Sequence, residues 1–202
     1  LCSGNIAPDK CVKRSMSRFS LIIIFLLSGC QLFTPREAGW TALGAGYYQL
    51  LDHWQGQPQQ LVQQISWSSG KQQHQFMVSV LLQPEAILVV AISPLGQELW
   101  RMRYAQGHQM TLSGIAPFNQ PDFARRLLAE MQLALLTDDE LAPRLKGLVL
   151  TSTPDQRRLV DLQHRLVLQI DNPARTGSGQ TIRLQGSDYQ LQIITLQQDF
   201  MP

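Results

Sequence analysis

The chain has 202 residues, of which 44% are hydrophobic and 16% are charged, and its formal net charge is +2. This length and apolar content suffice for one domain with a sizeable core. The small net charge predicts neither a basic face for nucleic acid nor an acidic tail, so nucleic acid is not an expected partner. All three cysteines lie within the first 30 residues, which excludes a thiolate metal site and a disulfide framework from residues 31–202.

An apolar run over residues 19–27 ("FSLIIIFLL") follows Arg18 near the N-terminus. A membrane-spanning helix needs about 20 apolar residues, so this run is too short to span. Its length is typical of the apolar region of a secretory signal, and Arg18 supplies the preceding positive charge. Met16 is a natural initiator. We therefore expect residues 1–15 to be upstream sequence from an early start assignment and residues 16–29 to be a lipoprotein signal peptide.

The signal ends in Leu27-Ser28-Gly29-Cys30, a leucine and two small residues before a cysteine. This order resembles the bacterial lipobox, which implies signal-peptidase cleavage before Cys30 and acylation of Cys30, whose thiol is the nucleophile. The alternative is an ordinary signal peptide or buried helix with an incidental cysteine. Several acyl chains, at about 0.8 kcal/mol per buried CH₂, anchor a protein stably. By resemblance to enterobacterial sorting, Gln31 favours the periplasmic face of the outer membrane.

Residues 31–46 ("QLFTPREAGWTALGAG") contain proline, glycine and small residues without a clean period. This composition is typical of a flexible connection. We therefore expect residues 30–56 to form the lipidated N-terminus and a tether, and residues 57–202 to form the folded domain.

Residues 59–115 are predicted to form an antiparallel meander of about five strands. Apolar and polar side chains alternate along most of this stretch, as in half-buried strands. Residues 86–92 ("AILVVAI") are apolar throughout and predict a strand buried on both faces. Hairpin-length turns rich in Gly, Pro and Ser separate the apolar runs.

An amphipathic helix is predicted over residues 121–136, where the period changes from two to that of a helix. The apolar residues at helical spacing are Phe123, Leu127, Met131 and Leu135, with Leu128 beside them. Thr137 and Glu140 predict a capping box for a second, short helix, and further strands are predicted after Gly147. Because strands and helices do not alternate, a parallel sheet is not expected.

The predicted fold is therefore mainly β (α+β). It is a strongly curved antiparallel sheet, or incomplete β-barrel, with the amphipathic helix packed in its concave mouth. Such a sheet makes a concave apolar chamber.

The turn Ser93-Pro94-Leu95-Gly96, the strand "QELWRMRY" after it and the helix "DFARRLLAEMQLALL" resemble an uncharacterised family of bacterial lipoproteins. Genes of that family often lie beside aryl-polyene pigment clusters. The family is similar in fold to the outer-membrane lipoprotein receptor LolB and its periplasmic partner LolA. The resemblance covers residues 57–198. It implies a LolA/LolB-like domain that binds a lipid or acylated ligand and receives it from a LolA-like periplasmic carrier.

The resemblance to LolB implies that Pro94, Leu95 and Gly96 form a membrane-insertion loop with Leu95 protruding. The alternative is a type II-like turn with Leu95 folded into the core. The fold also implies a lipid chamber, whose candidate lining residues are Trp67, Phe76, Val78, Val80, Trp100, Met102 and Tyr104. The alternative for each of these side chains is simple packing against the helix.

The sequence contains no catalytic constellation, and we expect neither a cofactor nor a metal. The four histidines show no ligand spacing, and His74, His108 and His164 are expected to be solvated near turns. No nucleophile motif accompanies His53, so the protein is not expected to be an enzyme. An unrecognised hydrolase remains as an alternative only if it depends on a polar residue such as His53, and two non-enzymatic functions are also open. One is a lipid carrier or acceptor, and the other is a scaffold lipoprotein that holds a complex at the membrane.

Overall fold

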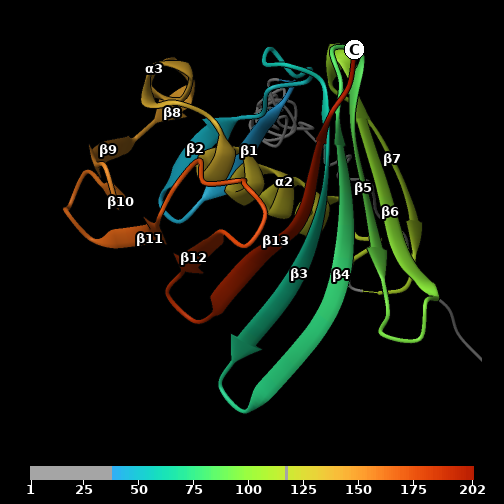
Figure 1. Ribbon diagram of the computed structural model, residues 1–202. Coiled ribbons are helices and arrows are strands. Elements are labelled where there is room, and N and C mark those ends of the chain that lie inside the picture. Colours follow the sequence, from blue (N-terminus) through green and yellow to red (C-terminus); the bar gives the residue numbers. More distant parts are fainter. Residues whose placement is uncertain (1–37, 117) are drawn as a thin grey trace, which may run out of the picture. The chain divides into compact units, whose positions relative to one another are not determined.

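A ten-stranded antiparallel sheet dominates the structure, a computed structural model that describes residues 38–116 and 118–202 (Figure 1). The strand order is β7-β6-β5-β4-β3-β13-β12-β11-β10-β9. The two edge strands, β7 and β9, do not pair with each other, so the sheet does not close into a barrel. Its strands are β3 (Gln59–Ser69), β4 (Gln72–Leu82), β5 (Ala86–Ile92), β6 (Glu98–Ala105), β7 (Gln109–Gly114), β9 (Leu148–Thr153), β10 (Gln156–Asp161), β11 (Leu166–Asp171), β12 (Thr181–Gln185) and β13 (Gln190–Phe200). The predicted open, curved antiparallel sheet is confirmed.

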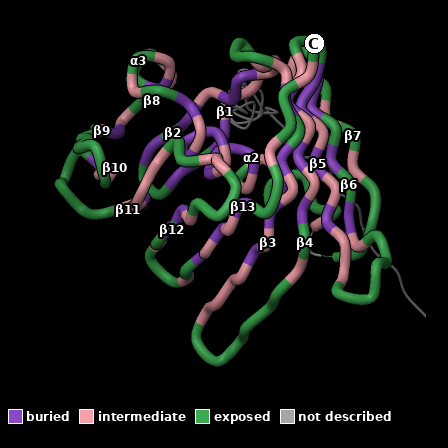
Figure 2. Tube along the Cα trace, in the orientation of Figure 1, coloured by how far each residue is buried: buried purple, intermediate pink, exposed green. Residues whose placement is uncertain are grey.

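The five-stranded meander predicted over residues 59–115 is confirmed by β3 to β7. Burial alternates along these strands, and the hairpin tips are exposed (Figure 2). The prediction that β5 is buried on both faces is wrong. Its inner residues Ile87, Val89 and Ala91 are buried, whereas the alternate residues on the outer face are half-buried. Only the inner face is covered, as is common for antiparallel sheets.

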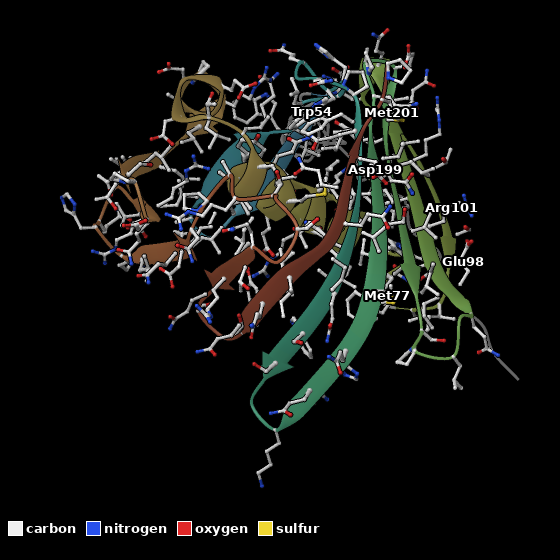
Figure 3. The ribbon with its side chains drawn as sticks, viewed as in Figure 1. Trp54, Met77, Glu98, Arg101, Asp199 and Met201 are labelled. Atoms are coloured by element: carbon white, nitrogen blue, oxygen red, sulfur yellow. The ribbon has the colours of Figure 1, made fainter. Side chains whose placement is uncertain are left out.

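The outer face of the meander carries both apolar and charged side chains. Met77 of β4 and Arg101 of β6 lie on this face (Figure 3). Arg101 donates to Glu98 at 3.1 Å and 2.6 Å, and both side chains are exposed. Such exposed pairs contribute little to stability.

The predicted helix is confirmed as α2 (Pro121–Leu135), which lies behind β13 in Figure 1 and packs on the concave face. Its most buried residues include Ala124, Leu128 and Gln132, while Phe123 is 38% exposed. Leu127, Leu128 and Met131 line the cavity between the helix and the sheet, as the predicted stripe requires, whereas Gln132 contacts Tyr48 and Leu51 of the N-terminal segment. No helix among the described residues is long and apolar enough to cross a membrane.

The predicted second helix is also present. Thr137 is the N-cap of α3 (Asp138–Leu141). Its backbone N–H donates to Glu140 Oε2 at 2.8 Å, as the capping box requires. One 3₁₀ turn follows α3 at Ala142–Arg144, and another connects β6 to β7 at Gln106–His108.

The tether expected up to residue 56 is wrong for the described residues from Trp40 onward. β1 (Trp40–Leu43) and β2 (Gly46–Gln49) form a hairpin that pairs with β8 (Leu145–Lys146) in a second, three-stranded sheet. Tyr48, Leu50 and Leu51 are fully or almost fully buried. Gly44 turns the hairpin with a φ of +56°, and a side chain at Gly46 would clash with Leu148. These glycines serve a tight turn and close packing rather than flexibility.

Gln132 joins this hairpin segment to α2. It is 1% exposed, and its Oε1 accepts from the Leu51 N–H at 2.9 Å and from the Tyr48 hydroxyl at 3.1 Å. Its Nε2 donates to the Leu51 carbonyl at 2.6 Å. The amide therefore satisfies three buried polar groups that the core otherwise leaves unpaired. At the same end of α2, buried Arg157 of β10 donates to the carbonyl of the next residue, Leu133.

Candidate functional site

The concave face of the sheet brings the predicted chamber residues together opposite α2. Val78, Val80, Trp100, Met102 and Tyr104 are buried, and Trp67 and Phe76 are half-buried. All belong to one apolar cluster that also contains the buried side chains of α2. The predicted chamber is therefore part of the hydrophobic core, and α2 occupies most of it.

A cavity of about 50 Å³ remains between the sheet and α2. Four of the predicted residues line it, Phe76, Val78, Val80 and Met102, together with Leu127, Leu128 and Met131 of the helix. The cavity is almost entirely apolar apart from Gln63 and Glu130. A water molecule occupies about 30 Å³ in the liquid, so this cavity is smaller than the volume of two water molecules. An acyl chain is much larger and needs more room than α2 leaves in this conformation.

The other three predicted residues lie around the cavity rather than on its wall. Trp67 stacks on His74 with ring centres 5.4 Å apart. The Tyr104 hydroxyl is 2.9 Å from His108 Nδ1. The indole Nε1 of Trp100 is buried and has no hydrogen-bond partner among the described residues. An unpaired buried donor is costly, so Trp100 offers a polar contact beside an otherwise apolar space.

Phe118 closes one end of the chamber. It lies in the connection between β7 and α2, and its ring is 5.9 Å from that of Phe76, 6.1 Å from that of Trp100 and 5.4 Å from that of Phe123. It therefore fills the gap between the sheet and the start of the helix. Sequence reasoning did not single out Phe118, because its segment has no periodicity.

Glu130 forms a polar boundary on another side of the cavity. It is 5% exposed, and its Oε1 accepts from the Tyr189 hydroxyl at 2.6 Å and from Arg126 Nε at 3.0 Å. The Arg126 guanidinium lies over the Tyr189 ring at 5.0 Å. Burial raises the pKa of Glu130 above its usual range, and the two hydrogen bonds offset this only in part. We call these three residues the Glu130 network.

The Glu130 network separates the apolar cavity from the surface. Glu130 lines the cavity and also an outer hollow of about 160 Å³ that includes Arg126 and Tyr189. Sequence reasoning missed Glu130, although its position three residues after Leu127 put a carboxyl beside the apolar stripe.

The turn at residues 93–96 presents Leu95 to solvent. The Gly96 N–H donates to the Ser93 carbonyl at 2.9 Å, and the Gln97 N–H donates to Ser93 Oγ at 3.1 Å. Gly96 has a φ of +81°, whereas Leu95 does not have a positive φ, so the turn is not type II. Leu95 is 88% exposed. The alternative in which Leu95 folds into the core is therefore wrong.

The family model described as "Protein of unknown function (DUF3261)" matches residues 60–197. The chain belongs to the DUF3261 family. The matched range contains β3 to most of β13, with α2, Leu95 and the Glu130 network, whereas the β1–β2 hairpin lies outside it. No curated protein matches the chain. Among solved structures, the chain is similar to a LolA superfamily protein from Nitrosomonas europaea, with 10% identity, coverage of 75% of this chain and 89% of that chain, and a TM-score of 0.44.

Asp52 and His53, just ahead of the DUF3261 range, take part in a polar network with residues inside that range. Asp52 Oδ1 is 2.8 Å from His53 Nδ1, and its Oδ2 accepts from the Gly107 N–H at 2.7 Å. Burial acts to raise the pKa of Asp52, but these hydrogen bonds bring it below its usual range. The expectation of a solvated His108 is wrong, because its ring contacts Tyr104 and its side chain is only 25% exposed. No group of three metal-ligating side chains occurs among the described residues.

The predicted lipobox of this DUF3261 protein, Leu27, Ser28, Gly29 and Cys30, lies outside the described residues. Its cleavage and acylation therefore stay predictions.

Replacing Glu130 with glutamine is expected to increase the free energy of unfolding at pH 7. A carboxyl whose folded pKa is raised opposes folding once it ionises, and this cost vanishes as the pH falls to about 4, near the unfolded pKa. Glutamine is neutral throughout and keeps an acceptor for Tyr189. Urea denaturation from pH 4 to pH 7 should show the gain of the variant growing with pH. Glu85→Gln, at an exposed turn, is the control, and a Glu130 variant less stable at pH 7 would contradict the prediction.

Proposed function

We propose that this DUF3261 protein is a lipoprotein, anchored through Cys30 at the periplasmic face of the outer membrane, that binds a lipid or acylated cargo and helps to insert it into the membrane. The proposed role is not enzymatic. The apolar cavity enclosed between α2 and the concave face carries the proposal, because its apolar lining matches an acyl chain, which would enter once the chamber widens. The proposed cargo is an aryl-polyene lipid on its export route, delivered by a LolA-like periplasmic carrier.

Binding of a chain requires the chamber to widen, and Phe118 is the side chain best placed to leave. An acyl chain that replaces its ring keeps apolar contact with Phe76, Trp100 and Phe123, so little apolar surface is lost. The unpaired indole N–H of Trp100 then has an acceptor in an ester or carboxyl oxygen.

Leu95 supports membrane contact at one end of the sheet. Burying a leucine side chain in an apolar medium is favourable by about 1.5–3 kcal/mol, and Leu95 is 88% exposed. Ile115, which is 53% exposed, lies near the start of β6, because its N–H donates to the Leu99 carbonyl at 3.0 Å. Two exposed apolar side chains therefore belong to the end of the sheet where β6 begins.

The anchor gives an all-or-none prediction. A Cys30→Ala chain is expected to lose acylation and membrane association, because no other thiol lies at the predicted cleavage position. Metabolic labelling with a palmitate analogue and membrane fractionation measure both properties. A Ser28→Ala variant keeps a small residue and the thiol, and should behave as the wild type. An acylated Cys30→Ala protein in the membrane fraction would contradict the lipobox assignment.

Lipid extraction tests the proposed cargo binding. The full chain, purified from the organism's own membranes and washed free of bulk phospholipid, should retain an acylated molecule that mass spectrometry detects in about equimolar amount. An arylated polyene chain in that extract would identify the cargo class. A protein that retains no lipid, or only phospholipid in the proportions of the membrane, would contradict the proposal.

The small size of the cavity favours a second candidate, a non-enzymatic scaffold lipoprotein that holds a biosynthetic or envelope complex at the membrane. With about 50 Å³ free, α2 fills most of the chamber. The edge strands β7 and β9 are available for strand pairing with a partner. A pull-down that recovers such enzymes stoichiometrically from a lipid-free protein would favour this candidate over the first.

A further inference from the structure

A large hollow lies on the outer face of the sheet. It measures about 640 Å³ and runs over the lower halves of β4, β3, β13 and β12 in Figure 1, and reaches β11. The inner face of the same segment carries Trp67, Leu184 and Leu191 of the core cluster. The hollow and the apolar cavity are therefore on opposite faces of one sheet.

The strand register places polar side chains over this hollow in two rows. Residues directly opposite each other in neighbouring strands project from the same face. The first row is Gln75, Ser66, Gln192, Arg183 and Asp171. The second row is Gln73, Ser68, Gln190, Gln185 and Gln169. All ten positions are polar, six are glutamines, and all but Gln169 line the hollow. We call this surface the glutamine shelf.

Most amides of the glutamine shelf have unused hydrogen-bonding capacity. Among the described residues, no partner contacts the side-chain amides of the five glutamines on β4, β13 and β12. At the far end, Gln169 and Gln156 both donate to Asp171, at 3.2 Å and 3.1 Å. Each free amide offers one acceptor oxygen and two donor hydrogens. The shelf is thus a dense array of neutral donors and acceptors.

Charge and topology narrow the class of ligand. Arg183 and Asp171 are the charged members of the shelf and cancel each other, so neither an anionic nor a cationic polymer is favoured. Each of the five strands has a neighbour on both sides, so a peptide cannot add to the sheet here. The shelf also has no exposed apolar anchor of the kind that protein interfaces use.

We propose that the glutamine shelf binds an extended, uncharged glycan. Each unit of such a chain presents several hydroxyls that both donate and accept, which matches the alternating donors and acceptors of the amides. Neighbouring strands are about 4.8 Å apart, so a chain that crosses the strands meets a new pair of side chains at each step. The core packing behind the shelf holds the backbone in place before binding, which lowers the cost of binding.

Pelleting with insoluble glycans tests this proposal. The full chain is purified in a detergent without a sugar headgroup, because a glycosidic detergent would compete for the shelf. It is then mixed with chitin or cellulose, two insoluble glycans without charged side groups. We expect binding to at least one of these, and a Gln75→Ala/Gln192→Ala variant should bind it about tenfold more weakly, which corresponds to the loss of two neutral hydrogen bonds.

A matched control separates the shelf from glutamine-rich surface in general. Gln109→Ala removes an exposed glutamine from β7 of the same sheet, far from the shelf in strand order, and should bind like the wild type. No binding to either glycan, or equal binding by the shelf variant and the wild type, would overturn the proposal. Neither outcome depends on lipid binding, because the shelf and the chamber are on opposite faces.

Discussion

Replacing Gln132 with alanine is expected to lower the free energy of unfolding by about 3 kcal/mol. The substitution removes three hydrogen bonds and leaves the Leu51 N–H, the Leu51 carbonyl and the Tyr48 hydroxyl unpaired in the core. Each buried, unsatisfied polar group costs about 1–3 kcal/mol. The lost hydrogen bonds are the ones that join the β1–β2 hairpin segment to α2. The three-stranded N-terminal sheet should therefore unfold at lower denaturant than the rest of the domain.

Denaturant unfolding followed by circular dichroism measures this effect, and hydrogen exchange locates it. The amides of β1 and β2 should lose protection at lower denaturant than those of β3. Gln180→Ala removes an exposed glutamine and should change stability by no more than about 0.5 kcal/mol. A Gln132 variant that stays within about 1 kcal/mol of the wild type would mean that water or another side chain satisfies these groups.

Replacing Leu95 with aspartate is expected to leave the fold unchanged. It should weaken the equilibrium for insertion of its loop into a bilayer by about 100-fold or more. Leu95 is 88% exposed, so its removal costs no core packing. Burial of leucine is favourable by about 1.5–3 kcal/mol, whereas aspartate within a bilayer is opposed by about 2.5–3.5 kcal/mol. Each difference of about 1.4 kcal/mol is a factor of ten.

A fluorescent label next to the turn reports insertion. The chain has no cysteine after Cys30, so Gln97→Cys provides a single free thiol for an environment-sensitive dye once residues 1–29, with Cys2 and Cys11, are cleaved off and Cys30 is acylated. In anchored proteoliposomes the dye should emit at shorter wavelength in the chain that keeps Leu95 than in the Leu95→Asp variant. The same dye at Gln106→Cys, in the β6–β7 turn, is the control and should not respond. Equal emission from the leucine and aspartate chains would contradict insertion.

The strands and α2 could be predicted because their periodicity comes directly from which face is buried. The alternation of Trp100, Met102 and Tyr104 with Arg101 and Arg103 predicts β6, and the structure buries the first set. The outer face of β5 could not be predicted from its composition, since an apolar run looks the same whether its second face is covered or half-exposed.

The β1–β2 hairpin was missed because glycine has two uses. Gly44 and Gly46 suggest a linker by composition, but one turns the hairpin and the other allows close packing. The apolar residues Tyr48, Leu50 and Leu51 that follow were the available signal, since a tether has no reason to be apolar.

Long-range polar contacts were beyond sequence reasoning. Tyr189 is 59 positions from Glu130, and Gln132 is 81 positions from Leu51. A buried carboxyl or amide on a helix is visible as a polar residue beside an apolar stripe, but its partner is set by the packing of distant elements. The glutamine shelf likewise needs the register of five strands, because a shift by one residue would turn these side chains to the other face.

Lipid bound between α2 and the concave face is detected most directly by site-specific photocrosslinking in cells. Benzoylphenylalanine in place of Phe76 puts the photoreactive ketone on the wall of the cavity, on an aromatic position of similar shape. Benzoylphenylalanine in place of Gln75, the preceding position on the opposite face of β4, is the matched control. The proposed function predicts an acyl-chain adduct at position 76 after irradiation and none at position 75. No lipid adduct at position 76, or equal adducts at both positions, would contradict a lipid chamber.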